Sequence, residues 1–542
     1  IERKPLQALV DLGEAAVPTL ISVAENPKAN YSVRLAALAA LNGGDSPSAL
    51  PLMLRGTSTF EGALKGEAMA ALADYDDPRV APAIIANLGR GFYFLGEPGV
   101  KVLAGMKGRA LPDMIRALAF HPEAKVRSQL ADAIGMTRDP RAAEPLLAAL
   151  SDKDPEVRTS VAYALRRHPQ PVVVTALMLS SQDASESVRA ASMIALGILR
   201  APEAFDTLAR GLNDPSPGVR GAATSIVRID GPRAVPLLLP LFKDERVRYE
   251  VARAVAPLKD RRTIPGLLEV LRTRDAYQGE EAGAALAEMG VLEAIPILLS
   301  QLADTYKGES AAQALFTLGP AAADALLAFY PGSGKAKPKV IEALGGTRDL
   351  RAVNLLLPLL PSPKRVVPRD DYLFDTDSEI ALATIYALGH LRDRRALAPL
   401  LLLLKNEQWN WAAAEALGDL GAGEAVVPLI EALGQKRTRQ DAALALAKLG
   451  DPRGIEPLLA SLRQPENYDW QTIEALGSFR DPRVLTFLLE ALTTGLQGRS
   501  AARAFGNLRD PATLPALRKA AEDDDERVAE AAKEAIAKIE SP

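Results

Sequence analysis

The sequence reads DPRAAEPLL at residues 139–147, DPRGIEPLL at 451–459 and DPRVL at 481–485. We interpret each phrase as the start of a helix. Aspartate can accept a hydrogen bond from a free N–H group of the first turn, and proline lacks the N–H that would otherwise be unsatisfied there. The second proline of the phrase, such as Pro145, either marks the true first turn or kinks the helix near its start.

The second proline returns at a nearly constant interval along the chain. Pro112 and Pro145 are 33 residues apart, and Pro428 and Pro457 are 29 residues apart. Where the proline is missing, an apolar segment such as 325–327 keeps the period. An internal repeat of this length predicts stacked repeats, roughly seventeen in this chain.

Each period has room for two short helices and two tight loops. In one unit, the apolar block 146–150 is followed by a polar break at 151–155 and then by Val157, Val161 and Leu165, which have the spacing of one helix face. The second helix usually closes with Ala-Leu-Gly. The glycine permits either the close approach of a neighbouring helix or a left-handed helix end.

These phrases resemble the HEAT-like repeats named after phycobilisome lyases, and the similarity covers essentially the whole chain. The resemblance implies an all-α fold, a right-handed superhelical solenoid of antiparallel helix pairs whose second helices line the concave side. A single pair cannot bury its apolar face, so neighbouring pairs must cover it. Such repeats define an architecture and leave the function open.

We divide the chain into HEAT-like repeats at 1–360, a projecting loop at 361–378, and further HEAT-like repeats at 379–542. The period lengthens by some 15 residues at the loop, where three prolines exclude a helix. Long loops of this kind are either functional or disordered. The sequence of this loop favours neither the functional nor the disordered interpretation.

The two ends of the chain differ. The charged, alanine-rich segment 527–540 is expected to be a terminal cap helix, whose exposed side needs no neighbour. At the other end, Pro5 to Gly13 resembles the second helix of a unit whose first helix is absent. We therefore expect an N-terminus that is cut or unusually capped.

The composition of the chain disfavours or excludes several classes of function. The formal net charge of -4 gives no general attraction to a phosphate backbone, so nucleic-acid binding is disfavoured. The chain has no cysteine, which excludes disulfides, thiolate metal sites and cysteine nucleophiles. No stretch approaches 18 uninterrupted apolar residues, so a soluble chain without a membrane span is expected. The compartment is open, with the cytoplasm slightly favoured, and the oligomeric state is unassigned.

No catalytic, cofactor-binding or metal-binding constellation is found. The segment 332–335 reads GSGK but lacks the glycine spacing and the following Ser or Thr of a phosphate loop. His121, His168 and His390 lie in different repeats, without partners at metal-ligand spacing. We therefore expect a protein that is not an enzyme and needs no cofactor.

A Val-Arg pair recurs at the start of many second helices. Stacking would place these arginines in a row, which could bind phosphate or an acidic partner. Each unit also supplies acids nearby, and the repeat resemblance implies an Asp–Arg ladder between units. We favour the structural ladder. The arginines concerned are Arg34, Arg127, Arg158, Arg189, Arg220 and Arg248.

From about residue 270 onward, aromatic and polar residues replace this pair. Trp, Tyr and Arg dominate binding hot spots because they combine apolar area with a polar handle. We therefore predict a partner-binding ridge, although the aromatics could merely fill gaps left by small alanines. The predicted binding residues are Tyr277, Tyr306, Trp409, Trp411, Arg439, Tyr468 and Trp470.

The favoured function is a non-catalytic scaffold or adaptor that holds a protein or peptide in the concave groove. The repeat type alone suggests an alternative role as a bilin lyase or chaperone. A third possibility is nucleic-acid binding along a basic concave strip that includes Arg261, Arg262, Arg272 and Arg439. Neighbouring acids dilute that strip.

Overall fold

The computed structural model describes residues 13–42, 46–73, 75–89, 98–106, 108–273, 279–362, 376–435, 437–462, 470–492, 497–523 and 525–540. No strand occurs among these residues. Helices α2 to α35 form seventeen consecutive pairs, and the chain divides into two compact units at residues 1–266 and 267–542. The predicted all-α solenoid of about seventeen helix pairs is confirmed.

The first unit contains eight pairs. They are α2 (Val17–Glu25) with α3 (Tyr31–Asn42), α4 (Leu50–Thr59) with α5 (Gly62–Leu72), α6 (Val80–Ile85) with α7 (Pro98–Gly105), α8 (Leu111–Phe120) with α9 (Ala124–Thr137), α10 (Ala143–Ala149) with α11 (Pro155–Leu165), α12 (Pro171–Ser180) with α13 (Glu186–Leu199), α14 (Phe205–Gly211) with α15 (Pro217–Ala223), and α16 (Val227–Leu238) with α17 (Arg248–Val255).

The second unit contains nine pairs. They are α18 (Ile264–Arg272) with α19 (Glu280–Glu288), α20 (Ile295–Gln301) with α21 (Gly308–Leu318), α22 (Ala323–Phe329) with α23 (Lys337–Gly345), α24 (Leu350–Leu356) with α25 (Thr376–Leu391), α26 (Leu397–Leu403) with α27 (Asn410–Leu420), α28 (Val426–Ala432) with α29 (Arg439–Lys448), α30 (Ile455–Leu462) with α31 (Trp470–Leu476), α32 (Pro482–Leu492) with α33 (Gly498–Leu508), and α34 (Leu514–Ala520) with α35 (Glu526–Glu540).

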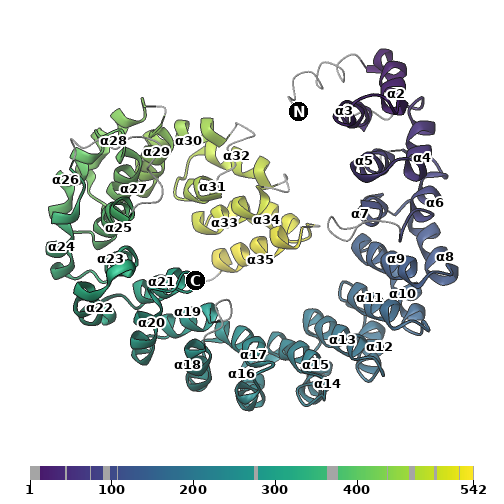
Figure 1. The fold of residues 1–542 in the computed structure, drawn as a ribbon, viewed down its shortest axis with the longest axis horizontal. Coiled ribbons are helices and arrows are strands. Elements are labelled where there is room, and N and C mark those ends of the chain that lie inside the picture. The colour runs from purple at the N-terminus through teal and green to yellow at the C-terminus, as the bar shows by residue number, and fades with distance from the viewer. Residues whose placement is uncertain are drawn as a thin grey trace. The chain divides into compact units, whose positions relative to one another are not determined.

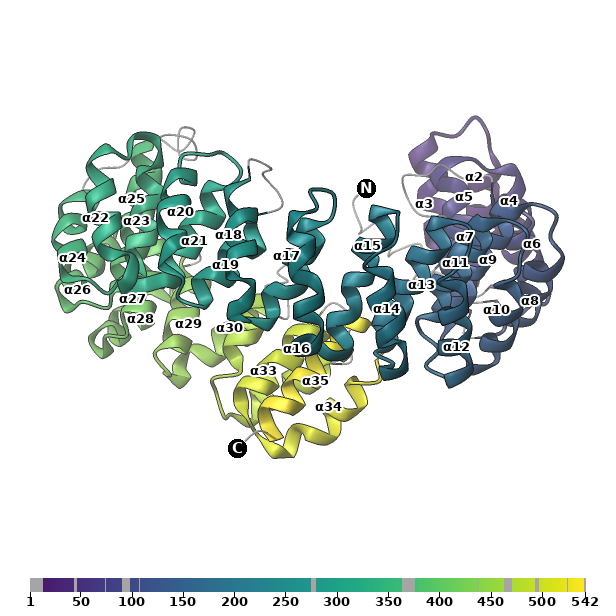
Figure 2. The same cartoon turned by 90° about the horizontal axis from the view of Figure 1, so that it is seen from below.

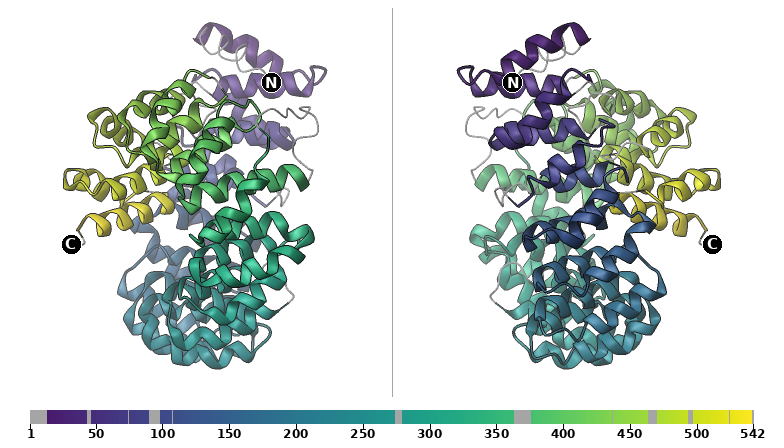
Figure 3. Two further views of the ribbon diagram at one scale, coloured as in Figure 1. Left: turned by 90° about the vertical axis from the view of Figure 1, so that its left-hand side faces the viewer. Right: turned by 90° about the vertical axis from the view of Figure 1, so that its right-hand side faces the viewer.

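Within each unit the helices form two layers. First helices such as α26 and α28 lie in one layer, and second helices such as α27 and α29 lie in the other (Figure 1). The second helices contact one another in series, α25 with α27 and α27 with α29. The other views likewise show only helices in the described parts of both units (Figures 2 and 3).

The Asp-Pro-Arg phrase begins a helix as predicted. The Asp139 carboxylate accepts a hydrogen bond from the Arg141 N–H at 2.9 Å, and Pro140 opens a short 3₁₀ turn. Helix α10 then begins at Ala143, with Pro145 in its first turn. Pro145 therefore marks the first α-helical turn, which follows a tighter 3₁₀ entry.

The glycine of Ala-Leu-Gly allows second helices to touch. A Cβ atom on Gly418 would lie 2.8 Å from the Cα atom of Ala445 in the next second helix. The same holds for Gly389 against Ala416, also at 2.8 Å. No Cβ atom fits at such distances, so close helix approach, and not a left-handed helix end, explains these glycines.

An Asp–Arg ladder connects the repeats of the first unit. Arg158 donates from Nε and Nη2 to both carboxylate oxygens of Asp183, at 2.8 Å each, and from Nη1 to the Asp152 carbonyl oxygen. Asp183 lies in the loop of the following repeat. The predicted structural ladder is confirmed for the pairs Arg127–Asp152, Arg158–Asp183, Arg189–Asp214 and Arg220–Asp244.

Two of the six arginines make other contacts. Arg34 donates to the Ala24 carbonyl oxygen at 2.9 Å, and Arg248 pairs with Glu245 three residues before it. The ladder therefore spans four interfaces, between Arg127 and Asp244.

In the second unit an amide pair replaces one rung. Asn410 has the register of Arg158, and its Nδ2 atom donates to the Gln435 Oε1 atom at 3.4 Å. The sequence separation of 25 residues is the one that joins Arg158 to Asp183. This rung is formed by two uncharged amides, whereas the Arg158–Asp183 rung joins a cation to a carboxylate.

The projecting loop predicted at 361–378 lies outside the described residues from 363 to 375, and α25 begins at Thr376. The incomplete unit expected at Pro5 to Gly13 also lies outside them, apart from Gly13. The expected cap segment is helix α35, whose charged side chains Arg527, Lys533 and Lys538 are exposed.

One stretch, 308–332, is long and apolar enough by composition to cross a membrane. It is not one straight helix, because it contains α21, the 3₁₀ turn Gly319–Ala322 with Pro320, and α22. Packing inside the fold buries 44% of its most apolar window. These are the features of repeat helices in a protein core.

Candidate partner-binding site

Trp411 lies in the first turn of α27, on the second-helix layer of the second unit. Its indole Nε1–H donates to the Gln408 carbonyl oxygen at 3.2 Å. Its ring meets Tyr386 of α25 edge to face, with the ring centroids 6.3 Å apart. Trp411 is only partly buried. The contacts therefore hold the ring in place and leave part of it exposed.

Tyr386 connects this tryptophan to carboxylates. Its hydroxyl donates a hydrogen bond to Glu415 of α27, and Asp441 of α29 lies close enough to act on it electrostatically. Burial, together with these carboxylates, raises the pKa of the Tyr386 hydroxyl. Tyr386 is therefore a neutral donor at physiological pH. It lies between an aromatic ring and an acidic cluster.

A Trp-Glu motif occurs twice in this layer. The sequence is WAAAEALG at 411–418 and WQTIEALG at 470–477, at the start of α27 and of α31. Residues four apart lie on the same side of a helix. Trp411 is therefore paired with Glu415, and Trp470, which is 50% exposed, with Glu474.

A third carboxylate has the same register. Glu342 precedes Ala-Leu-Gly in α23, as Glu415 and Glu474 do in their helices. Burial and the nearby Glu309 carboxylate raise the pKa of Glu342 to about 7. We call Glu342, Tyr386, Trp411, Glu415, Asp441 and Trp470 the acidic aromatic face.

The charge of the second helices differs between α3–α17 and α19–α31, whereas the last two second helices, α33 and α35, together add four carboxylates and five cations. From α19 to α31 they carry eleven carboxylates and four cations. From α3 to α17 they carry five carboxylates and ten cations. Four of those ten cations are the ladder arginines, which loop aspartates neutralise. The acidic layer of the second unit is therefore a local feature that the net charge of the chain conceals.

The cations that border the acidic aromatic face are already engaged. Lys448 pairs with Asp419 at 2.8 Å and with Glu415 at 3.7 Å. Arg503 pairs with Glu474 at 3.2 Å, and Arg439 donates from Nε to the Leu433 carbonyl oxygen. These pairs are partly exposed, so each contributes little to stability.

Not every predicted binding residue lies on this face. Trp411 and Trp470 do, and Arg439 is exposed at its edge. Trp409 is only 7% exposed and occupies the register of the buried Val157, so it packs inside the repeat and cannot contact a partner directly. Tyr277 and Tyr468 lie outside the described residues.

The sequence reasoning missed Glu342, Tyr386 and Glu415. A signal existed, because each immediately precedes Ala-Leu-Gly. The residue at that position differs between repeats, and in α25 and α27 it makes a contact between neighbouring second helices, from Tyr386 to Glu415.

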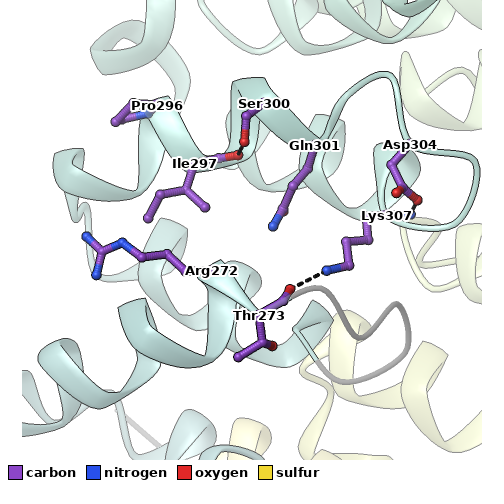
Figure 4. A pocket seen from close by; sticks show the side chains of 8 residues that line it. All are labelled: Arg272, Thr273, Pro296, Ile297, Ser300, Gln301, Asp304 and Lys307. Carbon is purple, nitrogen blue, oxygen red and sulfur yellow. Dashed lines mark hydrogen bonds between the residues drawn. The ribbon is translucent and has the colours of Figure 1, made fainter.

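Tyr306, another predicted residue, is not one of the residues of the acidic aromatic face. It is 66% exposed and adjoins a pocket of about 670 Å³ between α18 and α20. Figure 4 shows the pocket lining, which is Arg272, Thr273, Pro296, Ile297, Ser300, Gln301, Asp304 and Lys307. Most of these polar groups bond within the chain: the Lys307 ammonium donates to the Thr273 carbonyl oxygen, and Asp304 caps the Tyr306 N–H at 2.9 Å.

Arg262 and Arg272 are two of the arginines proposed for a basic strip. Arg262 is paired with Asp260 at 2.6 Å, and Arg272 lines the pocket. Among the described residues, no group of three or more His, Asp or Glu side chains could hold a metal ion.

Comparison with known families identifies the helix pairs. The model for HEAT repeats matches residues 111–181, 178–246 and 409–472. These helix pairs are HEAT repeats. The model for the PBS lyase HEAT-like repeat matches residues 247–273 and 499–523. The HEAT-like repeat type predicted from the sequence is confirmed, and no curated protein matches the sequence.

The chain is similar to several solved structures. Yeast importin-beta (Kap95p) matches with a TM-score of 0.58 and 12% identity over 99% of this chain and 91% of its own. Kap121p bound to Pho4p matches with a TM-score of 0.47 and 15% identity over 97% and 74%. The CpcE and CpcF complex of phycocyanin lyase from Nostoc sp. PCC7120 matches with a TM-score of 0.28 and 20% identity over 40% and 92%. At 12% identity the likeness to importin-beta concerns the fold alone, and the other two TM-scores lie below 0.5.

The acidic aromatic face overlaps a region matched as HEAT repeats, since Trp411, Glu415 and Asp441 fall within 409–472. Each of its side chains projects from the second helix of a repeat. The face therefore consists of variable positions on a repeated framework.

Proposed function

We propose that this chain is a non-catalytic scaffold that binds a polypeptide on the acidic aromatic face of its second unit. The observation that carries the proposal is the pair of tryptophans, Trp411 and Trp470, which share one register and remain partly exposed. Aromatic residues with both apolar area and a polar handle dominate binding energy at protein interfaces. Placing two in the same register of a repeat array gives a partner two anchors.

The supporting contacts favour binding over gap filling. Trp409 fills the interior of its repeat, whereas Trp411 is only partly buried and contacts Gln408 through a hydrogen bond and Tyr386 through its ring. A side chain held in its bound orientation loses less conformational entropy when a partner arrives. The face is thus preorganised around at least one anchor.

A displayed library of random peptides tests the proposal, because it does not require a known partner. The wild-type chain should enrich a family of peptides, and the variant Trp411→Ala/Trp470→Ala should not. The matched control is Phe120→Ala/Leu179→Ala, which removes two exposed apolar side chains from first helices of the other unit, 82% and 68% exposed. This control should enrich the same peptides as the wild type.

Circular dichroism of each variant establishes that the helices are retained. The proposal fails if the wild type enriches no peptide, or if the Trp411→Ala/Trp470→Ala variant enriches the same family to the same degree.

A further inference from the structure

We infer that each Trp–Glu pair of the second-helix layer, Trp411–Glu415 and Trp470–Glu474, receives an arginine or lysine side chain of an extended partner segment. The inference rests on the proposed function and adds the chemistry of the partner. It begins from the repetition of an aromatic ring and a carboxylate on one side of two helices.

The chemistry of the pair selects a cation. The face of an indole ring attracts a guanidinium or ammonium group, and a carboxylate one helical turn away can accept its N–H donors. A neutral apolar side chain would contact the ring but would shield the carboxylate from water without offering it a donor. An acidic side chain would be repelled. A basic side chain satisfies both members of the pair.

The carboxylates have room for a second donor. Glu415 accepts from the Tyr386 hydroxyl and has Lys448 at 3.7 Å, and Glu474 has Arg503 at 3.2 Å. An ionised carboxylate has about four acceptor sites, so these contacts do not exhaust it. Glu474 remains partly exposed beside its arginine, with 23% of its side chain accessible.

The second helices around the two Trp–Glu pairs carry an excess of negative charge, which would attract a basic segment. The second helices α19 to α31 have eleven carboxylates against four cations. Glu342 and Glu309 add a second acidic cluster two helices away from Trp411, and burial together with Glu309 raises the pKa of Glu342 to about 7. A nearby cation would relieve that repulsion. Nucleic acid, in contrast, would be repelled from this layer.

The geometry sets the spacing of the basic residues. Trp411 and Trp470 are separated by one intervening second helix, α29. Packed helices are about 8–10 Å apart, so the two pairs are roughly 16–20 Å apart. An extended chain advances about 3.3 Å per residue, which places the two basic residues about five or six positions apart.

Fluorescence anisotropy with synthetic peptides tests the inference. The first probe is a labelled Gly/Ser peptide with two arginines six positions apart, and the second has glutamates in their place. The wild-type chain should bind the arginine probe at least about tenfold more tightly than the glutamate probe. Added salt should weaken the arginine complex, because the contacts are partly exposed.

Two pairs of variants identify the groups responsible. Glu415→Gln/Glu474→Gln should weaken the arginine probe roughly tenfold, since it removes both charged acceptors. The control Glu293→Gln/Glu431→Gln removes the same charge from exposed positions in the 3₁₀ turn before α20 and in α28, and should change binding less than about twofold. Trp411→Leu/Trp470→Leu keeps an apolar contact but removes the ring, and should also weaken the arginine probe.

Equal affinity for the two probes, or equal effects of the two glutamine variants, would overturn the inference. A failure of the proposed function would give another result, namely a peptide library that yields no tryptophan-dependent family at all. If the library yields such a family but its peptides lack basic residues, the binding face stands and the cation inference is wrong.

Discussion

Arg158 donates two hydrogen bonds of 2.8 Å to the carboxylate of Asp183, which belongs to the loop of the following repeat. Both side chains are 16% exposed. The same arginine also closes its own loop, through the Asp152 carbonyl oxygen at 2.8 Å. One side chain therefore fixes the geometry within a repeat and the stacking between repeats.

Replacing Asp183 with Ala should destabilise the first unit. The change leaves a largely buried guanidinium without its carboxylate, and a hydrogen bond to a charged group contributes about 1.5–3 kcal/mol. Urea unfolding followed by circular dichroism should show a lower midpoint for the first unit. Asp206→Ala is the control, because Asp206 is 85% exposed in its ion pair with Arg233 and should leave the midpoint unchanged. Equal shifts for both variants would contradict a role for the ladder in stacking.

Replacing Gly418 with Ala should destabilise the second unit. The added Cβ atom would lie 2.8 Å from Ala445 Cα and 3.0 Å from its Cβ, and overpacking of this kind costs about 1–3 kcal/mol. Thermal unfolding measures the effect. Gly423→Ala offers the comparison within the next repeat, since no atom lies within 4 Å of its added Cβ atom. It should unfold at the wild-type temperature or above it.

Replacing Trp409 with Ala should lower stability far more than it lowers peptide binding. Trp409 is 7% exposed, and truncation of a buried aromatic side chain to Ala costs about 3–5 kcal/mol. Trp470→Ala should have the opposite profile, with little change in unfolding and a loss of binding. Guanidinium unfolding of the two variants compares them. A stability loss as large for Trp470→Ala would mean that this tryptophan, too, serves the interior.

The variant Glu342→Gln should be more stable than the wild type at pH 8 and equally stable at pH 4. Burial and Glu309 raise the folded-state pKa of Glu342 from 4.5 to about 7. The folded state disfavours the ionised form of this carboxyl group. The free energy of unfolding of the wild type therefore falls as the pH rises from 4.5 through 7. Unfolding midpoints at several pH values check this. A difference between the proteins that does not depend on pH would exclude ionisation as the cause.

The fold could be predicted because one phrase encodes it many times. Asp139 and Pro140 fix a helix entry, and Gly418 fixes a helix contact, by local chemistry that needs no knowledge of distant residues. The ladder was expected from the resemblance to HEAT-like repeats and from the acids near each arginine, and Arg158 does pair with Asp183.

The candidate site was predicted less well, because outward and inward positions alternate within a few residues. Trp409 and Trp411 are two positions apart, yet one is buried and the other faces outward. Comparing their register with Val157 and Thr159 of the regular repeat distinguishes them. Tyr386 escaped notice because its importance comes from contacts with Trp411 and Glu415 in the next repeat.

Several helices end in a left-handed residue that is not the glycine usually found at such a position. Arg138, Arg200, Arg348, Arg392 and Arg509 adopt left-handed φ values of 49° to 55° at helix ends, where Gly421 and Gly450 serve in other repeats. An L-residue pays about 1–2 kcal/mol for this conformation. A cation next to a helix C-terminus recovers part of that cost, but the cost alone would have predicted glycine.

The contact between glycine and alanine separates the stacking of neighbouring repeats from the binding of a partner, which most domains must achieve with the same residues. Every junction of this type uses the same small residues, so a repeat can be duplicated, lost or exchanged during evolution without redesigning its neighbours. The residue just before Ala-Leu-Gly differs between repeats, as Glu342, Tyr386 and Glu415 show, so selection can rewrite it one repeat at a time. A lineage could thereby acquire a new binding partner while inheriting its architecture intact.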